Sequence, residues 1–446
     1  MAGNGKKLRI GLLTYRGNMF CGGQGVYVVN LARALVARGH RVKVLSGPPY
    51  PAPVAGAEAE LVPDENFINK PASALPGPDP LSTFSPLTFL EYGLARAGAN
   101  PEMLAFSLRC FARIRRQHGF EPFDVIHDNQ GLGYGLLLLR ALGIPVVATI
   151  HHPLQVDRAE DLMQTNGLLA KIKRSIYYPI VMQKLVAQRL SRIITVSEFS
   201  RELVARTYGL DRERIAVAPN GVDADFFRPL QGVGRAPGRL LFVGSTEDRK
   251  KGVIYLLEAL AELPPEFRLA IVDGRRYPGR VYAAEAVARL GLSDRVEFKD
   301  KIGNEELAIE YNRAEIMVMP SLFEGFGLPA LEAMACGTPL ICTSAGALSE
   351  VADGDCALLV KPRSAAALRQ AVLRLDHDPQ ARRRMALAGR KRALEKFTWA
   401  AAAQILEKQY WSAIEDGRRA LASGTGRDRS ILPWIAPAPR QAKEGD

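Results

Sequence analysis

Two glutamates on either side of a glycine-rich turn are the residues of this sequence best suited to chemistry. Glu324 and Glu332 have seven residues between them, and the run Gly325-Phe326-Gly327-Leu328 directly follows the first acid. The glycines permit a tight turn into a helix whose first amides are unpaired and lie at the positive end of the helix dipole. This spacing predicts an anion site with a carboxylate at either end for hydroxyl groups. The alternative is a glycine turn before a glutamate that only favours the dipole.

A basic loop and a pair of histidines are candidates to complete such a site. Arg249 and Lys251 lie in a basic run that follows an expected strand, and their side chains suit phosphate. A solvated loop is the alternative interpretation of that run. His151, followed by His152, ends another expected strand, where parallel sheets present ligand-binding groups. We expect no metal site, because no further His, Cys or Asp stands at ligand spacing around the pair.

The elements that must position these residues alternate between short β-branched strands and helices. This pattern predicts an α/β fold of parallel sheets with helices on both faces. Gly22 and Gly23 follow the first strand and open a helix expected at 26–37. The segment 48–101 is expected to be a long loop with short helices. Strands are expected at 8–14, 41–46, 124–127, 145–150, 193–197 and 215–218, and again at 240–244, 269–272, 296–299, 316–320 and 339–343.

Length and composition limit the classes of protein to consider. A chain of 446 residues is longer than one hydrophobic core usually supports, so two domains are expected. The five cysteines have no regular spacing, and no apolar run is long enough for a signal peptide or a spanning helix, so we expect a cytoplasmic protein. We expect no nucleic-acid partner, because no binding motif for one is present.

The net charge of +12 raises the question of an anionic partner. Basic clusters on helices are often solvated faces, and attraction to anionic lipids or phosphorylated substrates is the alternative. Lys171, Lys173, Arg174, Tyr177 and Tyr178 form a basic and aromatic cluster of a kind found on interfacial helices. Two interpretations are open for this cluster: an ordinary exposed helix, and peripheral association with an anionic membrane on its inner face.

The acid pair, the glycine turn and the basic loop together resemble the E-x₇-E pattern of retaining glycosyltransferase family 4. The resemblance extends from about Lys7 to about Ile414. It implies the GT-B fold, in which two Rossmann-like, doubly wound parallel-sheet domains face a central cleft. It also implies a nucleotide-sugar donor without a metal or other cofactor.

Position by position, the resemblance implies roles for the quoted residues. Glu324 would contact the donor sugar and Glu332 the nucleotide ribose, while the backbone from Gly325 to Leu328 would hold sugar and diphosphate. His151 would reach the transferred sugar across the cleft. Gly22 and Gly23 would lie near the donor phosphates, together with Lys251. Ser245 stands where the family has an arginine, and we expect Arg249 to replace it.

The resulting prediction is a retaining, metal-independent glycosyltransferase that moves a sugar from a UDP- or GDP-sugar to a glycan, glycolipid or small-molecule acceptor. His151, Glu324 and Lys251 are its expected catalytic residues. The expected domains are an acceptor domain at 1–228, a donor domain at 229–396, a crossover helix at 397–418 and a disordered tail at 419–446. The alternatives are another GT-B enzyme, namely a phosphorylase or a nucleotide-sugar epimerase, and a non-catalytic nucleotide-sugar-binding partner.

Overall fold

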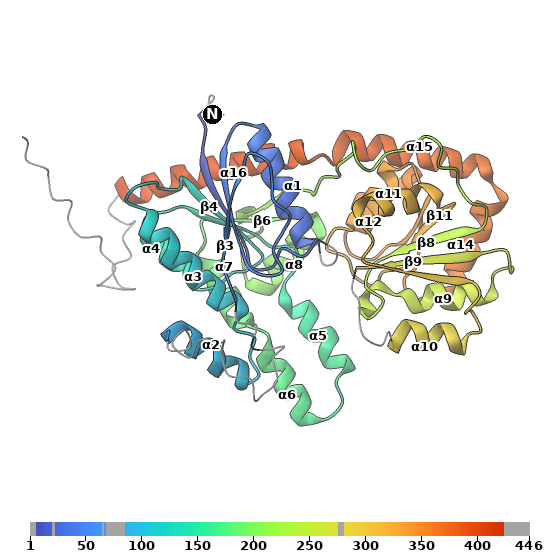
Figure 1. Cartoon of the computed structure of the whole chain (residues 1–446), viewed down its shortest axis with the longest axis horizontal. Helices are drawn as coiled ribbons and strands as arrows, with labels where there is room; N and C mark the ends of the chain where they lie inside the picture. The colour runs from blue at the N-terminus through green and yellow to red at the C-terminus, as the bar shows by residue number, and fades with distance from the viewer. Residues whose placement is uncertain (1–5, 20–22, 65–66, 68–84, 275–280, 423–446) are drawn as a thin grey trace, which may run out of the picture.

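The computed structural model describes residues 6–19, 23–64, 67, 85–274 and 281–422 of the chain. Gly22 and the end of the expected tail, 423–446, therefore lie outside the described residues. The chain forms two α/β domains, each built on one parallel sheet, as predicted (Figure 1).

The first domain contains a seven-stranded parallel sheet of order β3-β2-β1-β4-β5-β6-β7. Successive residues of its strands pack into different clusters on the two faces of the sheet, as with Leu12 and Leu13. Such burial on both faces explains why the strands read as continuous apolar runs. The strands are β1 Arg9–Thr14, β2 Arg41–Ser46, β3 Glu58–Leu61, β4 Val125–Asn129, β5 Val146–Thr149, β6 Arg192–Thr195 and β7 Ile215–Val217. The helices are α1 Gln24–Ala37, α2 Pro86–Arg96, α3 Glu102–Gln117, α4 Gly135–Ala141, α5 Leu154–Gln164, α6 Leu168–Tyr177, α7 Ile180–Arg189 and α8 Glu198–Tyr208.

The second domain repeats this arrangement with a six-stranded parallel sheet of order β10-β9-β8-β11-β12-β13. Its strands are β8 Arg239–Val243, β9 Arg268–Asp273, β10 Val296–Asp300, β11 Ile316–Met319, β12 Leu340–Thr343 and β13 Leu358–Val360. Its helices are α9 Val253–Glu262, α10 Val281–Arg289, α11 Asn304–Arg313, α12 Leu328–Ala335, α13 Leu348–Val351, α14 Ala365–His377 and α15 Pro379–Lys396.

Two strands were not predicted. β3 lies in the segment that we expected to form a loop with short helices, and β13 follows β12 at the far edge of its sheet. Both are edge strands without a fully buried residue. β3 therefore alternates acidic and apolar residues, and the apolar run of β13 is only three residues long.

The final described helix, α16 Trp399–Ala422, leaves the second domain and packs along the first (Figure 1). Leu406 and Tyr410 are buried in the cluster that also contains β1 and α1. The Tyr410 hydroxyl lies 2.7 Å from Nδ1 of the buried His127 on β4. α16 is therefore part of the core of the first domain.

Candidate active site

Each sheet has one point at which the strand order reverses, between β1 and β4 in the first and between β8 and β11 in the second. In open parallel sheets, ligands bind outside the carboxyl ends of the strands at such points. The loop after β8 contains Lys251, and the loop after β11 contains Glu324. Gly23 precedes α1 after β1, and His151 follows β5. The predicted residues thus lie at the ligand-binding edges of both sheets.

The loops of the two domains are in contact. A Cβ atom placed on Gly325 would lie 2.8 Å from the carbonyl oxygen of His151, so only glycine fits there without a shift of the backbone. The same atom placed on Gly23 would lie 3.6 Å from Leu328 Cδ1. The carbonyl of Gly325 also accepts a hydrogen bond of 2.8 Å from Ser197, at the start of α8. The glycine turn of the second domain therefore lies beside both Gly23 and His151 of the first domain.

Glu324 and Lys251 form an ion pair in this region. Lys251 Nζ lies 2.7 Å from Glu324 Oε1, and the Ser321 hydroxyl donates to the same oxygen at 2.9 Å. The Glu324 side chain is nearly buried, whereas the Lys251 side chain is 27% exposed. A carboxylate and an ammonium group are therefore held side by side, and the lysine side chain is partly exposed.

Gly327 starts α12 in the left-handed region, at φ 100°, and a Cβ atom there would lie 2.6 Å from Leu348 Cδ2. A residue other than glycine would be strained at this φ, and it would also collide with a core leucine. The Phe326 ring is buried in the core against Phe397, with ring centroids 5.8 Å apart. Only the backbone of Phe326 is thus available to a ligand.

Glu332 lies on α12 beside the hydroxyl of Tyr311, which donates to Oε2 at 2.7 Å. Burial raises the pKa of Glu332 to about 7, although the Tyr311 hydrogen bond opposes the rise. With this pKa the ionised form gains population as the pH rises through neutrality, and that form accepts on both oxygens, whereas the protonated form donates from one of them.

His151 is held as a neutral imidazole. Its Nε2 lies 2.8 Å from Asn129 Oδ1. Asn129 Nδ2 contacts the carbonyl oxygen of Gln24, so its Oδ1 is the acceptor and His151 Nε2 carries the proton. Burial, followed by the charges of His152 and His127, lowers the pKa of His151 to about 3. The edge of Tyr27 packs against the ring, with centroids 4.8 Å apart.

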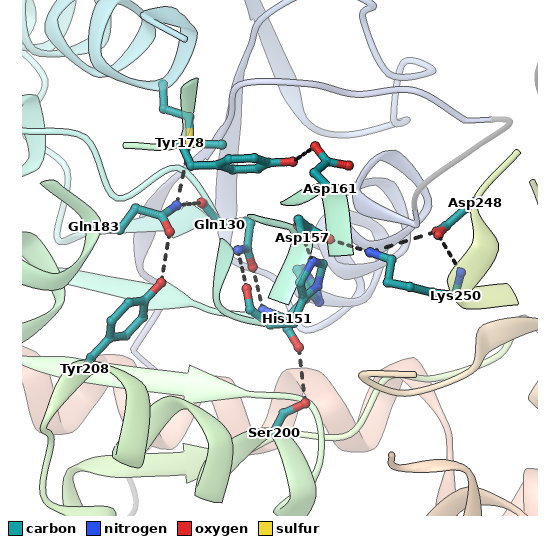
Figure 2. Close-up of polar contacts among 12 residues, drawn as sticks. Gln130, His151, Asp157, Asp161, Tyr178, Gln183, Ser200, Tyr208, Asp248 and Lys250 are labelled. Carbon is teal, nitrogen blue, oxygen red and sulfur yellow. Dashed lines mark hydrogen bonds and ion pairs between the residues drawn. The ribbon is translucent and has the colours of Figure 1, made fainter. Parts of the chain in front are cut away.

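Arg249, the expected replacement of the family arginine, lies on the loop after β8. The Arg249 side chain is exposed, and its guanidinium lies over the ring of Tyr282, 4.8 Å from the centroid. Ser245, at the position of the family arginine, is buried. Lys250, which we had not singled out, points toward the first domain instead and pairs with Asp157 of α5 (Figure 2).

Besides Lys250, three residues of this region were not predicted from the sequence. Asp157 binds Lys250 and also lies 2.9 Å from His152 Nε2. Burial alone would raise the pKa of Asp157, but the His152 hydrogen bond and the Lys250 charge hold it well below its usual range. Gln130 contacts the backbone beside His151, and Glu350 accepts from the first amides of α8. Each acts through a partner distant in sequence, and no local motif marks such a contact.

The described residues also lack two kinds of feature. No group of three His, Cys, Asp or Glu side chains that could hold a metal occurs among them. In the same residues, every helix is too short or too polar to cross a membrane.

Comparison with known proteins supports the same interpretation. Residues 228–392 match the family model described as Glycosyl transferases group 1, and residues 21–226 match Glycosyltransferase Family 4. An MMP alpha-(1->4)-mannosyltransferase of Mycolicibacterium hassiacum is 37% identical over 411 residues, which cover 91% of this chain and 98% of that protein. A D-inositol 3-phosphate glycosyltransferase of Frankia alni is 31% identical over 422 residues, covering 88% and 95%.

Solved structures share the fold. Sucrose-phosphate synthase of Thermosynechococcus elongatus superposes with a TM-score of 0.69 at 25% identity, over 94% of this chain and all (100%) of that chain. Anabaena HepE in complex with UDP and glucose gives 0.67 at 19% identity, over 91% and 100%. With two α/β domains that face each other through these loops, and with these relatives, the chain belongs to glycosyltransferase family 4 and has the GT-B fold.

Proposed function

We propose that this glycosyltransferase is a retaining, metal-independent mannosyltransferase that uses a nucleotide-diphosphate sugar as donor. The observation that carries the proposal is the Lys251–Glu324 pair, which lies in the loop region where Gly325 contacts the His151 backbone. The partly exposed Lys251 side chain and the amides at the start of α12 suit a diphosphate, and they can neutralise it without a divalent ion. Glu324 and Glu332 are then placed for the sugar and the ribose at its two ends.

The proposed chemistry follows from this placement. The bond between the anomeric carbon and the diphosphate oxygen breaks, and its electron pair leaves with the nucleoside diphosphate. Lys251 and the α12 amides stabilise that negative charge as it develops. The acceptor hydroxyl attacks the same face of the sugar and gives its proton to the departing phosphate, which retains the anomeric configuration. His151 is held neutral and uses its Nε2 proton on Asn129, so it would meet a hydroxyl of the transferred sugar through Nδ1, as an acceptor.

The choice of mannose and of a glycan acceptor rests on the relatives. The mannosyltransferase of M. hassiacum covers nearly the same length and is more similar to this chain than the inositol phosphate glycosyltransferase of F. alni. We therefore propose transfer to a glycan hydroxyl. A glycolipid or a small molecule such as an inositol phosphate is the alternative acceptor.

A panel of sugar nucleotides tests the donor. Bound ligand raises the thermal midpoint by mass action, so GDP-mannose, UDP-glucose and their free nucleotides are compared in the presence of EDTA. Product formation with labelled GDP-mannose and mannose oligomers is followed under the same conditions, and NMR gives the anomeric configuration. A requirement for added metal, or an inverted product, would contradict the proposal.

We also propose that α6 attaches the enzyme to the cytoplasmic face of an anionic membrane. No residue of α6 is buried, and Leu168 and Leu169 are 75% and 83% exposed. Together with Met163 of α5, Ile172 and Ile176 line an open groove of about 490 Å³. The helix carries three basic residues and no acidic one. These charges oppose the pairing of two copies through α6 and favour anionic headgroups.

Vesicle co-sedimentation tests this surface. We expect binding to vesicles with anionic lipid, weaker binding to zwitterionic vesicles, and loss of binding in Leu168→Ser/Leu169→Ser. Leu387→Ser is the matched control, because Leu387 is an exposed leucine (65%) on α15 of the second domain. Equal sedimentation of the double variant, or dimerisation without lipid binding, would show that α6 has another role.

A further inference from the structure

The carboxamide of Gln130 binds the backbone on both sides of the His151 side chain. Gln130 follows β4, and its Oε1 accepts from the His151 amide at 2.6 Å, while its Nε2 donates to the His152 carbonyl at 2.7 Å (Figure 2). The side chain is almost fully buried, at 1% exposure. Both polar ends of the carboxamide are therefore used, and both are used on the segment that carries His151.

The backbone of Gln130 is itself held in an unusual conformation. Its φ is 69°, in the left-handed region that favours glycine, and the nearby Leu132 has φ 50°. Such conformations persist only where neighbouring contacts impose them. The Gln130 amide donates to the Thr149 carbonyl at 2.9 Å. Its carbonyl accepts from Gln183, whose Oε1 accepts from the Tyr208 hydroxyl at 2.9 Å (Figure 2).

The segment held by Gln130 reaches the second domain. The Ser200 hydroxyl of α8 lies 3.2 Å from the His151 carbonyl and 3.1 Å from the Gly325 carbonyl. It has one hydrogen to donate, so it lies between one acceptor from each domain. The position of the His151 backbone thus determines both where the imidazole lies and how the glycine turn beside Glu324 is contacted.

We propose that Gln130 is a positioning residue for His151 in sugar transfer. The inference rests on the proposed function in one respect, namely that His151 acts on the transferred sugar. Gln130 itself touches neither substrate. It fixes the peptide group before His151 and the one after His152, so that the imidazole and the His151 carbonyl between them are set before the donor binds.

The first test replaces the carboxamide by an apolar side chain of similar length. In Gln130→Met we expect kcat to fall about 10²-fold, as small misplacements of catalytic groups do. The dissociation constant of the free nucleoside diphosphate should change little, because its proposed ligands lie in the second domain. Tyr208→Phe is the matched control. It removes the hydrogen bond from the Tyr208 hydroxyl to Gln183 and leaves both hydrogen bonds of the Gln130 carboxamide in place, so its kcat should remain near that of the wild type.

The second test uses pH. In Gln130→Glu the ionised carboxylate can accept from the His151 amide but cannot donate to the His152 carbonyl, whereas the protonated form can do both. We expect the ratio of its kcat to that of the wild type to rise as the pH falls from about 8 to about 6, by up to tenfold per unit. Burial keeps the pKa of His151 in the wild type near 3, so that imidazole does not titrate in this range.

The outcomes separate this inference from the proposed function. The imidazole NMR signals of His151 should move in Gln130→Met and stay in place in Tyr208→Phe, whether or not a donor has been found. Unmoved signals, or a folded Gln130→Glu protein whose deficit is the same at every pH, would overturn the positioning role. A wild-type protein without sugar transfer would instead count against the proposed function alone.

Discussion

Two donors share one carboxylate oxygen of Glu324, and this arrangement leaves the other oxygen for a ligand. Lys251 and Ser321 both contact Oε1. Among the described residues, no hydrogen bond to Oε2 is found. A sugar hydroxyl can therefore bind Glu324 without displacing either donor. An ammonium group has three protons, so Lys251 can keep this contact while it binds a phosphate.

Glu324→Gln and Lys251→Ala should each reduce kcat by about 10²-fold or more, because each removes a charge that acts on the donor. Steady-state kinetics with the donor found in the panel measures the effect, and thermal unfolding measures stability in parallel. Glu202→Gln is the control, since Glu202 forms an exposed ion pair with Arg206 on α8. Wild-type turnover and unchanged sugar-nucleotide affinity in both site variants would contradict the assigned roles.

The pH dependence of nucleotide binding should report Glu332. Its pKa of about 7 means that raising the pH through 7 ionises the group and strengthens its acceptance of ribose hydroxyls, so affinity should rise from about pH 6 to pH 8. Calorimetric titration with the free nucleoside diphosphate measures this change. Glu332→Gln should flatten the profile. Tyr311→Phe removes the hydrogen bond that lowers the pKa of Glu332, and it should shift the profile to higher pH.

The raised pKa of Glu332 also makes the stability of the folded chain depend on pH. The carboxyl of Glu332 has a higher pKa in the folded chain than its ordinary value of 4.5, so the folded state binds more protons between these two values. The free energy of unfolding should therefore contain a contribution that falls as the pH rises from about 4.5 to about 7. Chemical denaturation of the wild type and Glu332→Gln across this range isolates the contribution of this residue.

At the scale of elements, one helix of the first domain is capped from the second. α8 has its own cap, since the Ser197 hydroxyl accepts from the Ser200 amide at 3.0 Å. The amides of Glu198 and Phe199 instead donate to the two oxygens of Glu350, at 2.8 Å and 2.7 Å. A carboxylate suits this helix end, because the first amides and the dipole both favour negative charge. The start of α8 is thus complete only when the domains are in contact.

Glu350→Ala should accelerate hydrogen exchange at the amides of Glu198 and Phe199, with a loss of about 1 kcal/mol, as for other helix caps. Ser364→Ala is the matched control, because Ser364 caps α14 within the second domain. That variant should lower stability while leaving exchange at α8 unchanged. Unaltered exchange at the two α8 amides in Glu350→Ala would mean that the domains rarely adopt this contact in solution.

The elements show what the sequence could and could not predict. Buried strands such as β5 were predictable because burial on both faces requires a continuous apolar run. The edge strands β3 and β13 have no fully buried residue, so they do not require a long apolar run, and they were not predicted. In the site, Glu324 and His151 were predictable from their places after strands. Gln130 was not, because its role depends on a backbone 21 residues away.

At the scale of the whole molecule, a charged pair joins the two domains beside the site. Lys250 of the second domain binds Asp157 of α5, and the two side chains are 17% and 23% exposed. Because both side chains are largely buried, replacing only one of them should lower the stability: the other charge would stay buried without its partner.

Asp157→Asn should therefore favour separation of the domains and increase the radius of gyration measured by small-angle X-ray scattering. The double variant Asp157→Asn/Lys250→Met should recover part of the lost stability, with a coupling of about 1 kcal/mol. Asp161→Asn on the same helix is the control, since Asp161 pairs with Arg174 inside the first domain. An unchanged radius of gyration in Asp157→Asn would show that other contacts hold the domains together.

The position of α16 has a consequence for biosynthesis. His127 is synthesised 283 residues before Tyr410, the residue whose hydroxyl it contacts in the folded chain. Leu406 closes the same apolar cluster. Although domains commonly fold in the order of their synthesis, the first domain of this nascent chain must keep part of its apolar core uncovered until α16 has been synthesised. During that interval a chaperone would have a binding surface that the finished enzyme no longer offers.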